Sequence, residues 1–168
     1  MSPAENRFQN LFLVSALSVL FAASAALVSM PVIRGAEKQS SDPWIAAQIV
    51  RPADFAHELR DKSEAPPTVV YIGFHTLFAG GHIPGATFHG SASTEQGLAD
   101  LKKWAEGLPR TTNLVVYCGC CPFEKCPNIR PAFTALNSMG FKKLHVLVLP
   151  TSFVADWVGK DYPIQKGM

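Results

Sequence analysis

All four cysteines of this 168-residue chain lie in one nine-residue segment, CGCCPFEKC, from Cys118 to Cys126. A disulfide inside so short a segment closes a small loop and restricts the unfolded chain little, so stabilising disulfides do not explain the clustering. Thiols at this spacing can act as nucleophiles, exchange between dithiol and disulfide, or bind a soft metal ion. The segment is therefore the candidate functional site, and its chemistry is that of sulfur.

The spacing within the segment keeps several sulfur chemistries open. Cys118 and Cys121 form a CxxC pair, and Cys120 is adjacent to Cys121, so an oxidised or persulfidated sulfur on one cysteine can be resolved by another. The same thiolates are ligands for Cu(I) or Zn, although the spacing does not match the paired CxxC arrangement of structural zinc sites. Nucleophilic or redox chemistry of these thiols requires no cofactor. A metal set, if there is one, comprises Cys118, Cys120, Cys121 and Cys126.

The elements on either side of the segment explain how it is positioned. Residues 113–117 (NLVVY) are typical of a buried strand, and Cys118 follows directly. A helix is predicted from the N-cap Asn128 through Met139. Reactive groups gather at the carboxyl ends of strands in open α/β sheets, and a helix N-terminus favours an anion. We therefore expect a Cys118 thiolate with a depressed pKa. The expected anion support comes from Gly119, Lys125, Asn128 and Arg130.

The remaining sequence alternates between short apolar runs of strand type and amphipathic helical patterns. Such alternation predicts one α/β domain, residues 44–168, with a mostly parallel central sheet and helices on both faces. The predicted strands are residues 68–72, 87–89 and 143–149, and the predicted helices are residues 52–60, 94–106 and 151–158.

The N-terminal region has a different composition from this domain. Residues 11–33 form an uncharged apolar run between Arg7 and Arg34, which is typical of a secretion signal or a single membrane anchor. We expect residues 1–35 to be that signal or anchor and residues 36–43 to be a linker. Either alternative exports the domain to the periplasm or another extracytoplasmic space, as a soluble protein or one associated with the membrane through residues 11–33.

The charge distribution excludes one class of partner. The formal net charge is +2, and the basic residues are interspersed with acidic ones, without a dense Lys/Arg run. A nucleic-acid partner is therefore not expected.

Four stretches together resemble a rhodanese-like domain, the sulfurtransferase family, and they occur in that family's order. The resemblance implies the rhodanese-like fold and a single cysteine, here Cys118, that attacks a sulfane sulfur, holds it as a persulfide and passes it on. The implied partners are a small sulfur donor and a thiol or other nucleophilic acceptor. The stretches are GGHIPGA at 80–86, VVYC at 115–118, MGFKKLHVL at 139–147 and DWVGKDYPI at 156–164.

The chain departs from the family pattern near the site. Where the family usually has Asp-x-Arg after its first core strand, this sequence has Tyr71, Ile72 and Gly73. The CGCCPFEKC loop is also longer than the family's usual active-site loop. Cys120, Cys121 and Cys126 are therefore residues that the resemblance does not explain.

The leading interpretation is an exported rhodanese-like sulfurtransferase or persulfide carrier in which Cys118 is the nucleophile and Cys121 or Cys126 is a resolving partner. Two alternatives remain. One is an extracytoplasmic dithiol redox protein, and the other is a non-catalytic module that uses the cluster from Cys118 to Cys126 to bind a metal or a partner.

Overall fold

The computed structural model describes residues 42–61 and 66–167. The predicted signal or anchor, residues 1–35, and most of the predicted linker, residues 36–43, lie outside the described residues. Within the described part of the chain, no helix has both the length and the apolar character that crossing a bilayer requires.

Five parallel strands form the sheet, in the order β1-β5-β4-β2-β3. β4 lies in the middle of this order, paired with β2 on one side and β5 on the other, so the residue after it is surrounded by neighbouring strand ends. Short edge strands flank these three. The strands are β1 (Ile49–Val50), β2 (Thr68–Tyr71), β3 (Thr87–Phe88), β4 (Asn113–Tyr117) and β5 (Lys143–Leu147).

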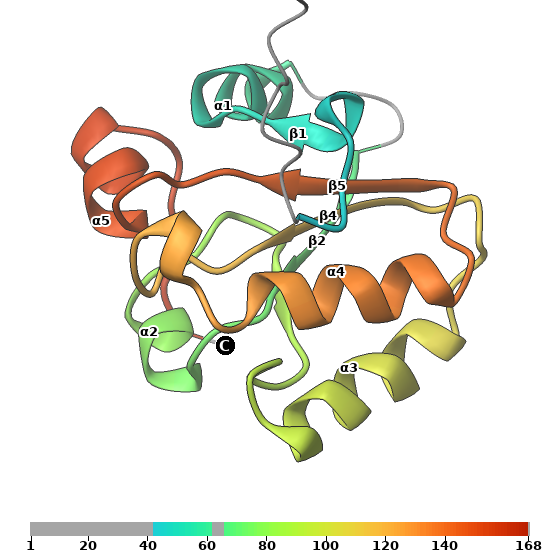
Figure 1. The fold of residues 1–168 in the computed structure, drawn as a ribbon. Coiled ribbons are helices and arrows are strands. Elements are labelled where there is room, and N and C mark those ends of the chain that lie inside the picture. Colours follow the sequence, from blue (N-terminus) through green and yellow to red (C-terminus); the bar gives the residue numbers. More distant parts are fainter. Residues whose placement is uncertain (1–41, 62–65, 168) are drawn as a thin grey trace, which may run out of the picture. The chain divides into compact units, whose positions relative to one another are not determined.

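Helices cover both faces of the sheet, as the sequence predicted (Figure 1). Helices α3 (Glu95–Glu106) and α4 (Ile129–Ser138) pack on one face, and α1 (Pro52–Arg60) packs on the other. Alternate side chains of the inner strands enter the two cores, because successive strand residues point to opposite faces. Val116 and Cys118 belong to the core under α3 and α4, whereas Val115 and Tyr117 belong to the core under α1.

Two short helices complete the end of the sheet at which the cysteines lie. They are α2 (His75–Gly80), which follows β2, and α5 (Phe153–Asp156), which follows β5. Three 3-10 turns also occur, at Ala46–Gln48, Phe123–Lys125 and Val158–Lys160.

The differences from the predicted elements are local. The predicted helix 151–158 begins later, at Phe153, because the Ser152 hydroxyl accepts a hydrogen bond from the Ala155 amide and caps it. β1 has only two residues and α2 only six, and neither was among the predicted elements.

Candidate functional site

Cys118 is the first residue beyond β4, and its side chain is 3% exposed. Gly119 then turns the chain with φ of +74°, in the left-handed region that glycine tolerates best. A Cβ atom at Gly119 would lie 2.7 Å from Phe153 Cβ and 2.9 Å from Leu149 Cδ1, so the turn also needs the missing side chain. The Gly119 carbonyl accepts a hydrogen bond of 2.9 Å from the Phe153 amide, which fixes the start of the loop against α5.

The loop returns to the helix α4 through the 3-10 turn Phe123–Lys125. The Phe123 amide donates to the Pro150 carbonyl at 3.2 Å, and the Cys126 amide donates to the Phe123 carbonyl at 3.1 Å. The Phe123 ring also packs against Trp44, with ring centroids 5.4 Å apart. These contacts fold the loop back on itself and bring its last cysteine beside its first.

All four cysteines are free thiols, and their sulfur atoms lie close together. Cys118 Sγ and Cys120 Sγ are 3.2 Å apart, and Cys120 Sγ and Cys121 Sγ are 3.3 Å apart. The sulfur atoms of Cys118, Cys120 and Cys126 all lie within 4.8 Å of one another. Cys118 and Cys126 are buried, whereas Cys120 and Cys121 are half-buried. We call these four residues the thiol cluster.

Asn128 lies beneath the thiol cluster and is fully buried. It occupies the N-cap position of α4, as predicted, but its side chain makes no capping bond to that helix. Its Oδ1 instead accepts hydrogen bonds from the Ser93 amide at 2.8 Å and the Ser91 hydroxyl at 3.0 Å. This leaves Nδ2 directed at sulfur, 3.5 Å from Cys118 Sγ and 3.8 Å from Cys120 Sγ. An amide held in this orientation can donate to anionic sulfur at either cysteine.

The helix N-terminus acts on Cys126 rather than on Cys118. A hydrogen bond with the Cys118 thiol and the backbone amides of Asn128 and Ile129 lower the pKa of Cys126 to about 5, although burial opposes this. The interaction with Cys126 and burial raise the pKa of Cys118. The depressed pKa expected at Cys118 is therefore found at Cys126, which hydrogen-bonds with Cys118 and stands just before the amides of Asn128 and Ile129.

Cys121, one of the two half-buried thiols, ionises less readily than Cys126. Burial and the hydrogen bond with Cys120 raise the pKa of Cys121 to about 12. Around neutral pH, the negative charge of the cluster therefore lies in its buried part, at the helix end.

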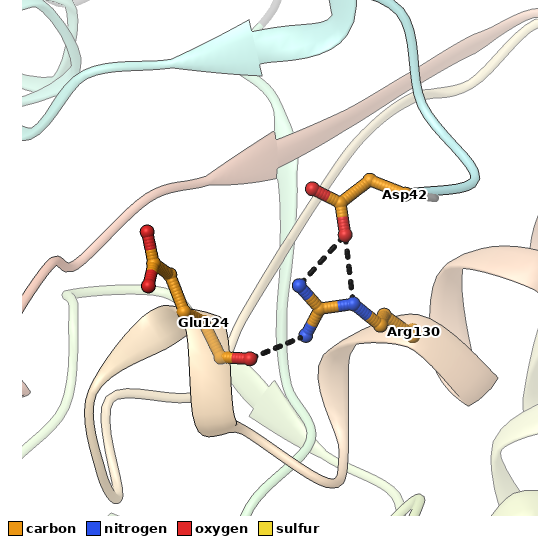
Figure 2. A network of polar contacts seen from close by, with 3 residues as sticks. All are labelled: Asp42, Glu124 and Arg130. Atoms are coloured by element: carbon orange, nitrogen blue, oxygen red, sulfur yellow. Dashed lines mark hydrogen bonds and ion pairs between the residues drawn. The ribbon is translucent and has the colours of Figure 1, made fainter. Parts of the chain in front are cut away.

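Arg130, predicted to support the anion, is used elsewhere (Figure 2). Its Nε and Nη2 both lie 2.7 Å from Asp42 Oδ1, and Nη1 donates to the Glu124 carbonyl at 3.2 Å. Its guanidinium also lies over the Trp44 ring, 5.6 Å from the centroid. Arg130 therefore anchors the 3-10 turn of the loop to the first described residues of the domain. The Lys125 side chain, also predicted as anion support, is exposed.

Tyr71 and Gly73 occupy the other side of Cys118. A Cβ atom at Gly73 would collide with the Tyr71 hydroxyl and would lie 3.0 Å from Cys118 Sγ, so the hydroxyl and the sulfur flank the same glycine. The Tyr71 side chain is 3% exposed, and its hydroxyl makes no hydrogen bond of normal geometry with the described residues; only the Phe74 amide acts on it, weakly. Burial, followed by the nearby Cys118 and Cys120, raises the pKa of Tyr71, so it remains a neutral donor.

An apolar hollow of about 400 Å³ opens beside Tyr71. It reaches the chain at Gly119, next to Cys118, and Lys166 places a charged side chain on its wall. Leu77 and Val154 are 49% and 69% exposed, so the apolar rim faces solvent. The other large side chains lining the hollow are Tyr71, Phe153, Val158 and Ile164.

The GGHIPGA turn connects this region to the central strand. The Ile83 amide donates to the Tyr117 hydroxyl at 3.0 Å, which ties the turn to the residue before Cys118. His82 is 2% exposed, its Nδ1 lies 2.9 Å from the Phe78 carbonyl, and its ring stacks on Phe78. The turn therefore supports β4 and holds α2 beside the hollow.

Comparison with solved structures decides the fold. The rhodanese-like domain of the Alr3790 protein from Anabaena sp. matches with a TM-score of 0.53 and 22% identity, over 71% of this chain and 79% of that one. The chain has the fold of rhodanese-like domains. The BH2092 protein from Bacillus halodurans matches with a TM-score of 0.54 and 16% identity, over 70% and 75% of the two chains.

Sequence comparisons add no closer relative. No family model matches the chain, and no curated protein matches it. At these identities the solved structures establish the rhodanese-like fold, and the chemistry must be argued from the thiol cluster itself.

The sequence predicted Asn128 as anion support, and its side-chain amide does approach the sulfur atoms. The Tyr71 hydroxyl, which lies near Cys118 and Cys120, was not predicted. One indication in the sequence marked Tyr71 as unusual, because it stands where the Asp-x-Arg pattern is usual. The spacing alone could not show that its hydroxyl reaches Cys118.

Proposed function

We propose that this protein is a rhodanese-like sulfurtransferase or persulfide carrier in which Cys118 is the sulfur-accepting nucleophile. One observation carries the proposal: in a rhodanese-like fold, Cys118 is the first residue after the central strand β4 and begins the loop to a helix N-terminus. This is the position at which reactive groups collect in α/β sheets.

In the loading step, the Cys118 thiolate attacks the outer sulfur of a sulfane donor. The Cys118 thiol proton passes to the neighbouring Cys126 thiolate, so the charge needed for attack moves onto Cys118. A new S–S bond forms at Cys118, and the S–S bond of the donor breaks. The leaving group is sulfite when the donor is thiosulfate, and a thiolate when it is an organic persulfide. No external oxidant or reductant is consumed.

In the transfer step, an acceptor thiolate attacks the outer sulfur of the Cys118 persulfide. The S–S bond at Cys118 breaks and the Cys118 thiolate is regenerated, so the acceptor leaves as a persulfide. The hollow beside Gly119 offers space for the body of a donor or acceptor molecule. Its apolar walls favour an organic thiol over an inorganic one in this step.

The persulfide anion needs hydrogen-bond donors, and two neutral side chains supply them. Asn128 Nδ2 already lies 3.5 Å from Cys118 Sγ. The Tyr71 hydroxyl, buried on the opposite side and without a good partner, gains one when the outer sulfur is added. These donors stand in for the charged pair that the sequence lacks after β2.

Dithiol exchange is the second candidate, and the 3.2 Å separation of Cys118 and Cys120 favours it. If the Cys120 thiolate attacks the inner sulfur of the persulfide, a Cys118–Cys120 disulfide forms and hydrosulfide leaves. The reaction balances without another oxidant, because the sulfane sulfur is reduced as the two thiols are oxidised. Cys120 is therefore the proposed resolving cysteine, ahead of Cys121 and Cys126.

Export is part of the proposal and is supported by the apolar run at residues 11–33. A reporter enzyme that is active only outside the cytoplasm, fused after residue 168, should be active. Deletion of residues 1–35 should abolish that activity; a reporter active only when retained inside the cell would refute export.

The function is tested by the intact mass of the full chain, reduced, metal-free and treated with thiosulfate. We expect a mass gain of one sulfur atom at early times in the wild type and in Cys121→Ser, before Cys120 resolves the persulfide, and none at any time in Cys118→Ser. Equal gain in Cys118→Ser would refute the nucleophile, and no gain in any form, with organic persulfide donors as well, would refute sulfur transfer.

A further inference from the structure

Three sulfur atoms of the thiol cluster converge from two separated parts of the loop. Cys118 and Cys120 lie at its start and Cys126 at its end, yet their sulfur atoms are all within 4.8 Å of one another. Within the described residues, no histidine or carboxylate completes this group. Its only donors are therefore thiol sulfurs, which select soft ions and disfavour Mg²⁺, Ca²⁺ and Mn²⁺.

The surroundings of the three sulfurs are those of a metal ligand set. The amides of Asn128 and Ile129 donate to Cys126, and Asn128 Nδ2 approaches both Cys118 and Cys120. Such donors orient thiolate ligands and offset their charge when the thiols lose their protons to a metal. Asn128 is itself held by Ser91 and Ser93, so the set is organised before any ion arrives.

The number of thiol ligands and their burial indicate which soft ion the site would bind. Structural zinc sites almost always use four ligands in a closed tetrahedron. Here Cys121 lies outside the group of three, although its sulfur is 3.3 Å from Cys120 Sγ. Two of the three converging thiols are buried, which leaves one open side, toward Cys120. Three thiolates without a fourth ligand suit a three-coordinate monovalent ion.

We propose that Cys118, Cys120 and Cys126 form a binding site for a single Cu(I) ion. The ion binds by exchanging thiol protons for Cu–S bonds, with no change of oxidation state. Because Cys118 is both a ligand and the proposed nucleophile, copper and sulfane sulfur compete for it. Copper occupancy then switches sulfur loading off.

The test is a Cu(I) titration of the reduced full chain under anaerobic conditions, in competition with a chromophoric Cu(I) chelator. We expect one Cu(I) per chain, with three sulfur neighbours by X-ray absorption. Cys120→Ser should bind Cu(I) at least about 10-fold more weakly, because losing a metal ligand costs no less than losing a residue that hydrogen-bonds to a ligand. Cys121→Ser is the matched control, and its affinity should be unchanged.

Three results would refute the copper site: a chain that cannot compete with the chelator for Cu(I), an equal loss of Cu(I) affinity in Cys120→Ser and Cys121→Ser, or a four-sulfur Zn²⁺ complex that requires Cys121.

A second measurement separates this proposal from the sulfurtransferase proposal. The metal-free chain is treated with thiosulfate with and without one equivalent of Cu(I), and its mass is determined. Sulfur gain only without copper supports both proposals. Sulfur gain in both samples refutes the copper site alone, and copper binding without any sulfur gain refutes sulfur transfer alone.

Discussion

The buried and the half-buried cysteines of one loop have different surroundings, although they are only a few residues apart. Cys118 and Cys126 are 3% and 4% exposed and receive the donors of the site, namely Asn128 Nδ2 and the amides of α4. Cys120 and Cys121 are accessible from solvent and mainly contact other thiols. We infer that the two pairs have different roles: Cys118 and Cys126 stabilise anionic sulfur, and Cys120 undergoes thiol–disulfide exchange with Cys118.

The largest effect expected from this comparison is in Cys120→Ser. Without the thiol 3.2 Å from Cys118, the persulfide has no resolving partner. Thiosulfate should still add one sulfur to the chain, but hydrosulfide release and the internal disulfide should disappear. Hydrosulfide is measured with a fluorescent probe, and the disulfide by the mass change on alkylation. Cys121→Ser should release hydrosulfide normally; if it behaves like Cys120→Ser, the two half-buried thiols act as one.

Gly73→Ala should strongly reduce both stability and sulfur loading, because Gly73 lies against the buried Cys118. Its Cβ would overlap the Tyr71 hydroxyl and lie 3.0 Å from Cys118 Sγ, where the persulfide must fit. We expect a loss of about 1–3 kcal/mol of unfolding free energy, typical of overpacking, and a larger fractional loss of sulfur loading. Urea unfolding and intact mass measure the two. The control is Gly80→Ala, because an added Cβ there has no atom within 4 Å; equal effects in both variants would contradict the steric argument.

Tyr71→Phe should slow sulfur loading by about 10-fold, because a hydrogen bond to a charged group contributes roughly 1.5–3 kcal/mol. Stability should change little, since the hydroxyl has no good partner before sulfur is added. Tyr117→Phe should lower stability and leave loading unchanged, the opposite of Tyr71→Phe. Its hydroxyl accepts from the Ile83 amide, so stability should fall by about 1 kcal/mol while loading is kept. Loading rates by mass spectrometry and urea unfolding distinguish the two; unchanged loading in Tyr71→Phe would remove Tyr71 from the site.

The pH dependence of stability tests the anion held at Cys126. The pKa of Cys126 is about 5 in the folded chain, against 9.0 as its ordinary value, so the unfolded chain binds more protons between these pH values. The contribution of Cys126 to stability is therefore complete above pH 9.0 and is lost as pH falls toward 5. Urea unfolding under reducing conditions should show a wild-type advantage over Cys126→Ser that grows from pH 5 to pH 8. A constant difference would contradict the lowered pKa.

Much of the fold follows from the sequence because its patterns are local. The buried runs at β2, β4 and β5 and the amphipathic helices α1, α3 and α4 were predicted within one or two residues at most ends. β1 was missed because an edge strand of two residues has no periodicity to detect. The confirmed α/β architecture then placed Cys118 at the end of a central strand.

The site was less predictable because its electrostatics depend on distant contacts. The sequence could not show that Arg130 would pair with Asp42, 88 positions earlier, instead of facing sulfur. That pairing depends on how the loop folds back, which is set by contacts to Pro150 and Trp44 rather than by spacing within the segment. By contrast, the amides that act on Cys126 belong to Asn128 and Ile129, two and three residues later, so that contact is local and follows from the spacing.

In the proposed reaction, the buried Cys118 carries the sulfane sulfur. The most direct measurement is tandem mass spectrometry of the thiosulfate-treated wild-type chain, with persulfides and thiols alkylated and the peptide containing the loop fragmented. We expect the additional sulfur on Cys118 at early times, with Cys126 alkylated as an ordinary thiol. An additional sulfur located on Cys126 or Cys121, with Cys118 unmodified at every time, would contradict it.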